Sequence, residues 1–185
     1  VSPSWFVVSS FDFLPLRAPY ARASLVEHSL PLQGTTAQFV PSAADNAKAL
    51  ELLTDGNPAT RWAAGRGIQE GGEQIEIHLA SPIRAVGVKL SPGTYSTDFP
   101  RGVEVAAGED CLGPPLAVHP SWQGALRFSA QGFPYFAAQS EVEILFPQEV
   151  SIRCIKITQT GRTSSFDWSV AEVRLLTAHA KRIGS

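Results

Sequence analysis

The chain has 185 residues, of which 44% are apolar and 17% are charged, and it contains 15 glycines and 14 prolines. This composition fits one globular domain rich in turns and excludes a mainly disordered chain. The formal net charge is −2 and the 15 Lys and Arg residues are scattered, so no basic block is available to bind nucleic acid or an anionic membrane.

Residues 1–36 differ from the rest of the chain in their hydrophobic pattern. Prolines at positions 3, 15, 19 and 31 interrupt their aromatic and apolar residues, and no hydrophobic period is visible. We interpret this segment as an irregular N-terminal extension or tether. The sequence begins at Val1, lacks Met and shows no signal-peptide pattern in residues 1–10, so we expect a piece of a longer precursor.

One short helix is expected within residues 43–53, where Ala47, Leu50 and Leu53 recur at helical spacing. Further along the chain, apolar residues alternate in short runs bounded by turn residues, which is the period of half-buried strands. These runs cover residues 74–79, 83–90, 103–105, 142–146, 155–157 and 170–176. The pattern predicts an all-β sandwich beside one short helix.

The turn that follows the expected helix is rich in oxygen atoms. Asp55, Asn57 and Thr60 place three polar side chains within six residues. Calcium requires several oxygen ligands of this kind. A plain turn, in which Asp55 and Asn57 bond their own backbone, explains the same residues. The turn alone leaves both interpretations open.

Motifs of catalysis are not visible in the sequence. His-Glu-x-x-His, Gly-x-Ser-x-Gly, Cys-x-x-Cys and a phosphate-binding Gly-x-x-x-x-Gly-Lys are all missing. The four histidines lie far apart in the chain, which does not indicate a shared metal or catalytic site. Cys111 and Cys154 are too few on their own for a disulfide scaffold or a four-ligand zinc site, and whether they form one bridge stays open.

Six segments follow the order of a discoidin domain: residues 55–62, 74–79, 83–88, 101–105, 152–157 and 168–173. The first reads Asp-Gly-Asn-Pro-Ala-Thr-Arg-Trp and the last Trp-Ser-Val-Ala-Glu-Val. On these motifs residues 37–177 resemble the coagulation factor 5/8 type C (discoidin) family, whose bacterial members include the family 32 carbohydrate-binding modules. The resemblance implies a galactose-binding-like fold, an antiparallel β-sandwich or jelly roll of about eight strands, with residues 178–185 as a C-terminal tail.

The sequence departs from the family pattern in two motifs and in one longer segment. His78-Leu79-Ala80 stands where many members have Asp-Leu-Gly, and Cys154 stands where an aromatic residue is usual. Residues 111–138 align poorly, and we expect an unusual loop there. These departures bear on local packing more than on the fold.

The resemblance also implies a structural calcium ion, which would join the oxygen-rich turn to the last strand. Its implied ligands are side chains of the turn and the last strand and three main-chain carbonyls: Asp55, Thr60 and Glu172 by side chain, and Leu52, Asn57 and Ala171 by carbonyl. The ion would stabilise the fold and take part in no chemistry.

For function, the resemblance implies a non-catalytic carbohydrate-binding module of a larger extracytoplasmic or carbohydrate-active protein, secreted, periplasmic or on the cell surface. Its partners would be a glycan and the other domains of the parent protein, with membrane contact only through that parent. Two alternatives stay open. One is an adhesion module for protein or phospholipid, and the other is a supporting domain within an enzyme, such as the outer domain of a membrane glycosyltransferase.

Family members bind through loops at one end of the roll, which correspond here to residues 63–72, 91–101 and 160–168. The candidate ligand-binding residues in these loops are aromatic, cationic or amide side chains: Arg66, Gln69, Tyr95, Phe99, Arg101, Arg162, Phe166 and Trp168. Trp62 and Trp168 belong to recurring motifs, so core packing is the alternative for them, and Phe99 has the alternative of plugging the barrel. Convergence of the three arginines would select an acidic glycan, whereas ordinary surface residues would not.

Overall fold

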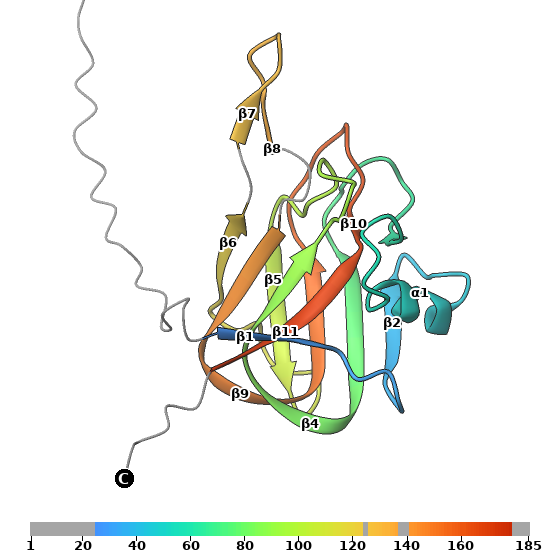
Figure 1. Cartoon of the computed structure of the whole chain (residues 1–185), viewed down its shortest axis with the longest axis vertical. Coiled ribbons are helices and arrows are strands. Elements are labelled where there is room, and N and C mark those ends of the chain that lie inside the picture. The colour runs from blue at the N-terminus through green and yellow to red at the C-terminus, as the bar shows by residue number, and fades with distance from the viewer. Residues whose placement is uncertain (1–24, 124–125, 137–140, 179–185) are drawn as a thin grey trace, which may run out of the picture.

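The computed structural model describes residues 25–123, 126–136 and 141–178. Within these ranges it contains one short helix and eleven strands: β1 (Leu25–Ser29), β2 (Thr36–Val40), α1 (Asn46–Leu52), β3 (Trp62–Ala63), β4 (Glu73–Ser91), β5 (Val103–Gly108), β6 (His119–Gln123), β7 (Leu126–Phe128), β8 (Pro134–Phe136), β9 (Glu141–Gln159), β10 (Ser169–Val170) and β11 (Glu172–Ala178). Seven strands form one antiparallel sheet that wraps into a sandwich (Figure 1). The all-β prediction is confirmed. The described part of the chain holds no helix with the length and apolar character of a membrane span.

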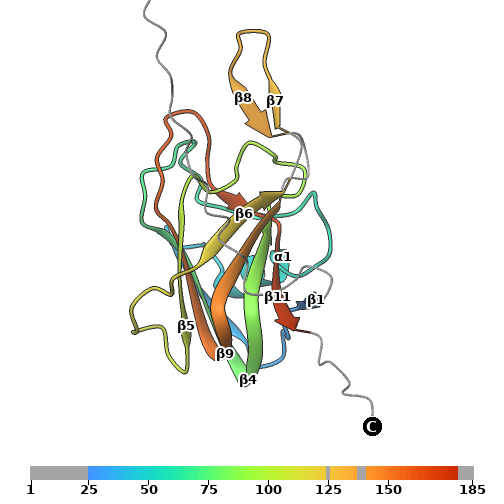
Figure 2. The same ribbon diagram turned by 90° about the vertical axis from the view of Figure 1, so that its left-hand side faces the viewer.

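Two long strands build both layers of the sandwich. β4 and β9 each have 19 residues and pair with each other along most of their length. One half of β4 pairs with β2 and the other half with β11, while β9 pairs with β6 and then with β5. Their mutual register shifts between His78 and Ile83 and again between Ala85 and Gly87. Such irregularities bend strands, which lets the pair curve around the core (Figure 2).

This continuity corrects one detail of the sequence interpretation. Residues 74–79 and 83–90 were expected to be separate strands divided by a turn at Ser81-Pro82, but both lie in β4. Pro82 lies where the pairing with β9 is interrupted, so its missing N–H group removes no ladder hydrogen bond. In the same way, the expected strands at 142–146 and 155–157 are the two ends of β9.

The core is built from the alternating residues of these strands. Ile75 and Ile77 of β4 and Ile155 and Ile157 of β9 are fully buried. Two tryptophans close the core near the loop end, with the Trp62 and Trp168 rings edge to face at 5.2 Å between centroids. Both tryptophans pack in the core, which for Trp168 was the alternative to ligand binding.

The short helix covers one side of β2. α1 begins after Asp45, whose side chain accepts a hydrogen bond from the Lys48 backbone N–H at 3.0 Å, a standard N-terminal cap. Ala49 and Leu50 are its buried residues. The predicted helix is therefore confirmed, with bounds inside the expected range 43–53.

The segment predicted to be an irregular extension contains a strand. β1 pairs with β11, and Glu27 forms ion pairs with Lys89 at 2.7 Å and with Arg174 at 3.0 Å. Leu25 and Val26 are the two apolar residues of this strand, and both are half-buried, which is too few to produce a visible period. Residues 1–24 and 179–185 lie outside the described residues.

The poorly aligned segment 111–138 contains a disulfide and a projecting hairpin. Cys111 and Cys154 are bonded, with their Cα atoms 5.5 Å apart, which resolves the open question about the two cysteines. β6 adds to the edge of the sheet beside β9. β7 and β8 form a separate hairpin that projects beyond the sandwich (Figures 1 and 2). Residues 124–125 and 137–140 lie outside the described ranges.

Candidate functional site

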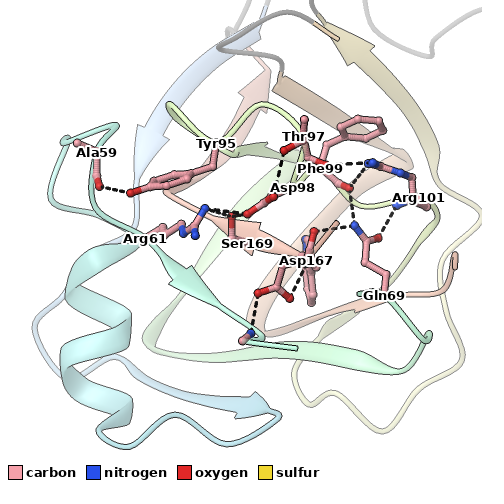
Figure 3. Close-up of polar contacts among 12 residues, drawn as sticks. Ala59, Arg61, Gln69, Tyr95, Thr97, Asp98, Phe99, Arg101, Asp167 and Ser169 are labelled. Atoms are coloured by element: carbon pink, nitrogen blue, oxygen red, sulfur yellow. Dashed lines mark hydrogen bonds and ion pairs between the residues drawn. The ribbon is translucent and has the colours of Figure 1, made fainter. Parts of the chain in front are cut away.

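The three predicted binding loops are joined into one surface by a buried glutamine. The Gln69 side-chain amide donates hydrogen bonds to the Phe99 carbonyl at 3.0 Å and to the Asp167 carbonyl at 2.8 Å, and its oxygen accepts from the Arg101 backbone N–H at 3.1 Å (Figure 3). The Gln69 backbone exchanges two hydrogen bonds with Thr163. Gln69 therefore fixes the relative positions of all three loops.

A second polar cluster, formed by Arg61, Asp98 and Ser169, holds the middle loop. The Asp98 carboxylate accepts from the Arg61 guanidinium at 2.7 Å and from the Ser169 hydroxyl at 2.9 Å. The Arg61 guanidinium also lies over the Tyr95 ring, 3.3 Å from its centroid, and the Tyr95 hydroxyl donates to the Ala59 carbonyl (Figure 3). These contacts place Tyr95 over the Arg61 side chain and leave it half-buried.

Two aromatic rings enclose a fixed guanidinium on the loop surface. Arg101 lies over the Phe99 ring at 3.7 Å and over the Phe166 ring at 5.3 Å. Its nitrogens donate to the main-chain carbonyls of Phe99 at 2.8 Å and Thr97 at 3.0 Å. Phe166 is 39% exposed. We call Phe99, Arg101 and Phe166 the stacked platform.

The close approach of neighbouring loops under this platform depends on a glycine. A Cβ atom at Gly161 would lie 2.4 Å from the main-chain carbon of Arg101. Any larger residue would therefore push the 160–168 loop away from the platform. Beside it, an open depression lies between the first and third loops and is lined by Ile68, Gln69, Glu70, Arg162, Thr163 and Ser164.

The structure brings together several of the predicted ligand-binding residues and corrects two. Phe99, Arg101 and Phe166 meet in the platform, and Arg162 lines the adjacent depression. Gln69 and Trp168, by contrast, are 2% and 0% exposed. Gln69 is buried because its amide satisfies loop carbonyls, and Trp168 is buried because it packs on Trp62.

The three arginines are not equivalent. Arg66 forms an ion pair with Glu70 in its own loop. Arg101 is committed to two carbonyls and two rings. Arg162 is exposed and has no ion-pair partner among the described residues. Of these three arginines, Arg162 alone has a guanidinium with neither an ion pair nor a hydrogen bond among the described residues.

The oxygen-rich turn has the compact hydrogen bonding of a plain Asx turn. The Asp55 carboxylate accepts from the Asn57 backbone N–H at 2.8 Å and from the Thr60 hydroxyl at 2.6 Å. These hydrogen bonds, that of Thr60 foremost, lower the pKa of Asp55 below its ordinary value. Asp55 is therefore a carboxylate at neutral pH.

Beside this turn lies a buried carboxyl group that is only partly satisfied. Glu172 is 7% exposed, and its Oε1 atom has no hydrogen-bond partner among the described residues. Burial raises the pKa of Glu172, the negative charge of Asp55 adds to this, and the Gly56 N–H and Arg174 partly oppose it. Glu172 and Gly56 line a hollow of about 230 Å³.

The last strand and the turn are in direct contact. The Val173 backbone N–H donates to the Leu53 carbonyl at 2.9 Å, and Thr94 donates to the Pro58 carbonyl at 2.9 Å. A Cβ atom at Gly93 would lie 2.1 Å from the Pro58 carbonyl oxygen, so this packing requires glycine. Asp55 and Glu172 therefore lie near enough to each other for the charge of Asp55 to act on the Glu172 carboxyl group.

Arg61, Thr97 and Asp98 hold the middle loop, a role that the sequence does not indicate for any of them. Arg61 belongs to the Thr-Arg-Trp motif, which is a sequence signal for it. Asp98 lies in a loop without a recognisable pattern. Its partners, Arg61 and Ser169, are 37 and 71 residues away in sequence, so only the fold reveals the cluster.

No protein-family model matches the sequence, and no curated protein matches it significantly. Solved structures do. The family 32 carbohydrate-binding module of Clostridium perfringens NanJ, in complex with galactose, matches with a TM-score of 0.51 at 18% identity over 82% of this chain and 99% of that module. A second Clostridium perfringens module, CpGH89CBM32-5, in complex with GalNAc-β-1,3-galactose, matches with a TM-score of 0.55 at 14% identity over 82% of this chain and 100% of that one.

A chitosan-binding module from a Paenibacillus sp. IK-5 chitosanase/glucanase matches with a TM-score of 0.51 at 17% identity, over 80% of this chain and 99% of that module. At such identities the likeness concerns the fold. The chain therefore has the galactose-binding-like jelly-roll fold of the family 32 carbohydrate-binding modules.

Proposed function

We propose that this chain is a non-catalytic carbohydrate-binding module that binds a glycan on the stacked platform. The observation that carries the proposal is the Phe99–Arg101–Phe166 stack on loops that Gln69 holds together. A sugar ring has an apolar face that packs on aromatic rings and a polar rim that hydrogen-bonds. Modules of the same fold in complex with galactose and with GalNAc-β-1,3-galactose support this function.

The platform is preorganised for such a ligand. Arg101 is held by two main-chain carbonyls, so little side-chain entropy is lost when a ligand packs against it. Phe166 offers its exposed ring at the edge of the stack. The depression beside Arg162 gives a neighbouring sugar unit polar contacts with Glu70 and Thr163.

We expect Phe166→Ala to weaken glycan binding by about 10-fold, because an aromatic contact of this kind contributes about 1–2 kcal/mol. A glycan array followed by calorimetry with the best-bound glycan measures the change. Phe133→Ala is the matched control, because Phe133 is 70% exposed on the β7–β8 side of the molecule and not on the platform. Unchanged affinity in Phe166→Ala would contradict the platform as the binding surface.

The charge of the glycan is proposed from Arg162. Since Arg66 is paired and Arg101 is committed, the earlier idea of three converging arginines reduces to one available guanidinium. A single guanidinium still favours a carboxylate or phosphate on the ligand. We therefore propose an acidic glycan, such as one containing a uronic acid, a sialic acid or a phosphorylated sugar.

For such a glycan, Arg162→Ala should weaken binding by about 10-fold, the equivalent of one charge-assisted hydrogen bond, and added salt should shrink the difference. Arg66→Ala is the matched control, since Arg66 already pairs with Glu70. Calorimetry at low and high salt checks both variants. Equal binding of neutral and acidic glycans by the unmodified chain would exclude the acidic preference.

We further propose that calcium binds between the oxygen-rich turn and β11. The residues present fit the ion, because Asp55 is ionised and the buried Glu172 Oε1 lacks a partner. Asp55, Thr60 and Glu172 would hold it by side chain, and Leu52, Asn57 and Ala171 by carbonyl. A cation there would neutralise two neighbouring carboxylates and join the turn to the last strand.

Calcium at 100 times its dissociation constant should stabilise the chain by about 2.7 kcal/mol, and a chelator should remove this. With the chelator present, the chain should become less stable as the pH rises above the ordinary Glu pKa of about 4.3. The reason is the raised pKa of Glu172: above that pH the folded state still binds a proton that the unfolded state has lost. Glu172→Gln should therefore be at least as stable as the unmodified chain in chelator at neutral pH, and less stable in calcium. Identical melting curves in calcium and chelator would refute the site.

An extracytoplasmic location is also part of the proposal. The Cys111–Cys154 disulfide supports it, because such bridges persist in oxidising compartments. In this setting the other domains of a parent protein would position the module on its glycan.

The projecting hairpin favours adhesion as a second candidate function. Phe128 and Phe133 are 65% and 70% exposed, and Arg127 precedes Phe128 in β7. Apolar rings with a basic neighbour are typical of segments that contact a phospholipid surface. Co-sedimentation with anionic vesicles that is lost in Phe128→Ser/Phe133→Ser but kept in Phe166→Ala would favour adhesion over glycan binding.

A further inference from the structure

A histidine and a glutamate lie beside the disulfide on the outer face of the sheet. His78 of β4 is the cross-strand partner of Cys154 of β9. The His78 Nε2 atom lies 3.8 Å from the Cys154 sulfur and 2.8 Å from the Glu76 Oε1 atom. His78 and Cys154 are also two of the positions at which the sequence departs from the discoidin motifs. These two departures therefore occupy one pair in the sheet.

The spacing of these atoms suits a small metal ion. The ligand atoms of Glu76, His78 and Cys154 all lie within 4.8 Å of one another. In a tetrahedral zinc site, with bonds of about 2.0–2.3 Å, ligand atoms are about 3.3–3.8 Å apart. Reduction would also free the Cys111 sulfur, which is bonded to that of Cys154 in the structure and lies outside the group of three. Two cysteines, one histidine and one carboxylate are all ligands that zinc accepts.

We propose that the chain binds one Zn²⁺ ion when the Cys111–Cys154 disulfide is reduced, with Cys111, Cys154, His78 and Glu76 as ligands. In the oxidised chain both sulfurs are used in the S–S bond, so disulfide and metal exclude each other. The site is distinct from the calcium proposal, which concerns the turn and β11.

The redox step balances with a dithiol as reductant. The dithiol gives two electrons and two protons to the disulfide, whose S–S bond breaks to leave two thiols, and the dithiol becomes a disulfide itself. Zn²⁺ then displaces the two thiol protons to solvent, and the neutral His78 ring binds the metal through Nε2 with its one ring proton on Nδ1. The Lys156 ammonium group donates to the Cys111 carbonyl at 3.0 Å and so holds the main chain of Cys111 against β9.

The exposure of the proposed ligands leaves a path for the ion from solvent to the two sulfur atoms. Cys154 is 0% and Cys111 4% exposed, so the sulfurs lie under the surface. The His78 and Glu76 side chains are 43% and 26% exposed, so the nitrogen and oxygen ligands face solvent. A metal ion can therefore reach the sulfurs past His78 and Glu76. If His78 and Glu76 formed only an ordinary surface ion pair, the reduced chain would not bind the metal ion through them.

The experiment uses the full chain, reduced with a dithiol that is then removed under anaerobic conditions, and compares it with the oxidised chain. Co²⁺ is titrated first, because thiolate charge-transfer bands and intense d–d bands report tetrahedral coordination by sulfur, and Zn²⁺ is then used to displace it. We expect one equivalent of Co²⁺ with these bands in the reduced chain, displacement by Zn²⁺, and no such bands in the oxidised chain.

Two substitutions sharpen the test. His78→Ala and Glu76→Gln should each weaken Zn²⁺ binding to the reduced chain by at least about 10-fold, as loss of a ligand or of its orienting partner does. His28→Ala is the matched control, because His28 lies in β1 and contacts Thr177. Circular dichroism checks that each reduced chain is folded. Absent cobalt bands, equal binding by His78→Ala, equal binding by the oxidised chain, or a reduced chain that is unfolded even with Zn²⁺ would each overturn the proposal.

Discussion

Replacing Trp168 with alanine should lower the free energy of unfolding by about 3–5 kcal/mol, as truncation of a buried tryptophan does. Trp168 is 0% exposed and lies edge to face with Trp62, which in turn contacts Phe39 at 5.1 Å between ring centroids. The cavity would open where the third binding loop enters β10, so the loss would also loosen the platform. Urea denaturation followed by fluorescence and circular dichroism measures the change.

Trp168→Phe separates packing from polarity. The Trp168 indole N–H is buried and has no hydrogen-bond partner among the described residues, so phenylalanine removes an unsatisfied donor while keeping a ring. We expect it to cost less than half as much as alanine. Unchanged stability of Trp168→Ala together with lost glycan binding would instead assign Trp168 to the ligand, the role that the sequence motif left open.

The core was predictable because its signal is local. Ile75, Ile77 and Leu79 alternate with polar residues, and the structure buries all three. The continuity of β4 through Pro82 was not predictable, because it depends on where β9 pairs with it. A proline between two strand patterns is read as a turn unless the partner strand is known.

In the binding loops, the contacts of individual side chains were harder to predict than those of the core. The sequence identified the loops and their rings, but it placed Gln69 on the surface because amide side chains usually lie there. Its burial depends on carbonyls of residues 99 and 167, and no local pattern encodes such contacts. Arg101 and Gln69 were both chosen by residue type. Residue type indicates which contacts a side chain can make, but the fold decides which partners it actually contacts.

The cluster beside the disulfide was missed because motif searches read spacing along the chain. Glu76 and His78 are two residues apart, but Cys111 and Cys154 are far away in sequence. The antiparallel register of β4 and β9 sets His78 opposite Cys154. A pattern that spans two strands and a loop becomes visible only when the pairing is known.

Removing the disulfide should have an effect of similar size to the loss of Trp168. A bridge between residues 43 apart lowers the entropy of the unfolded chain, which corresponds to about 4 kcal/mol at 25 °C in the loop-closure description. We therefore expect Cys111→Ser/Cys154→Ser to lower Tm by about 10 °C. Calorimetry in a metal chelator measures this shift without interference from any bound ion.

The double serine variant needs two controls, because serine also places a hydroxyl where Cys154 was buried. Cys111→Ala/Cys154→Ala avoids that hydroxyl and should lie between the serine variant and the unmodified chain. Reduction of the unmodified chain in chelator should reproduce most of the loss, whereas reduction should leave both double variants unchanged. If the serine variant had the same Tm as the oxidised unmodified chain, the bridge would not constrain the unfolded state. Residues 111 and 154 would then already lie close together in the unfolded chain.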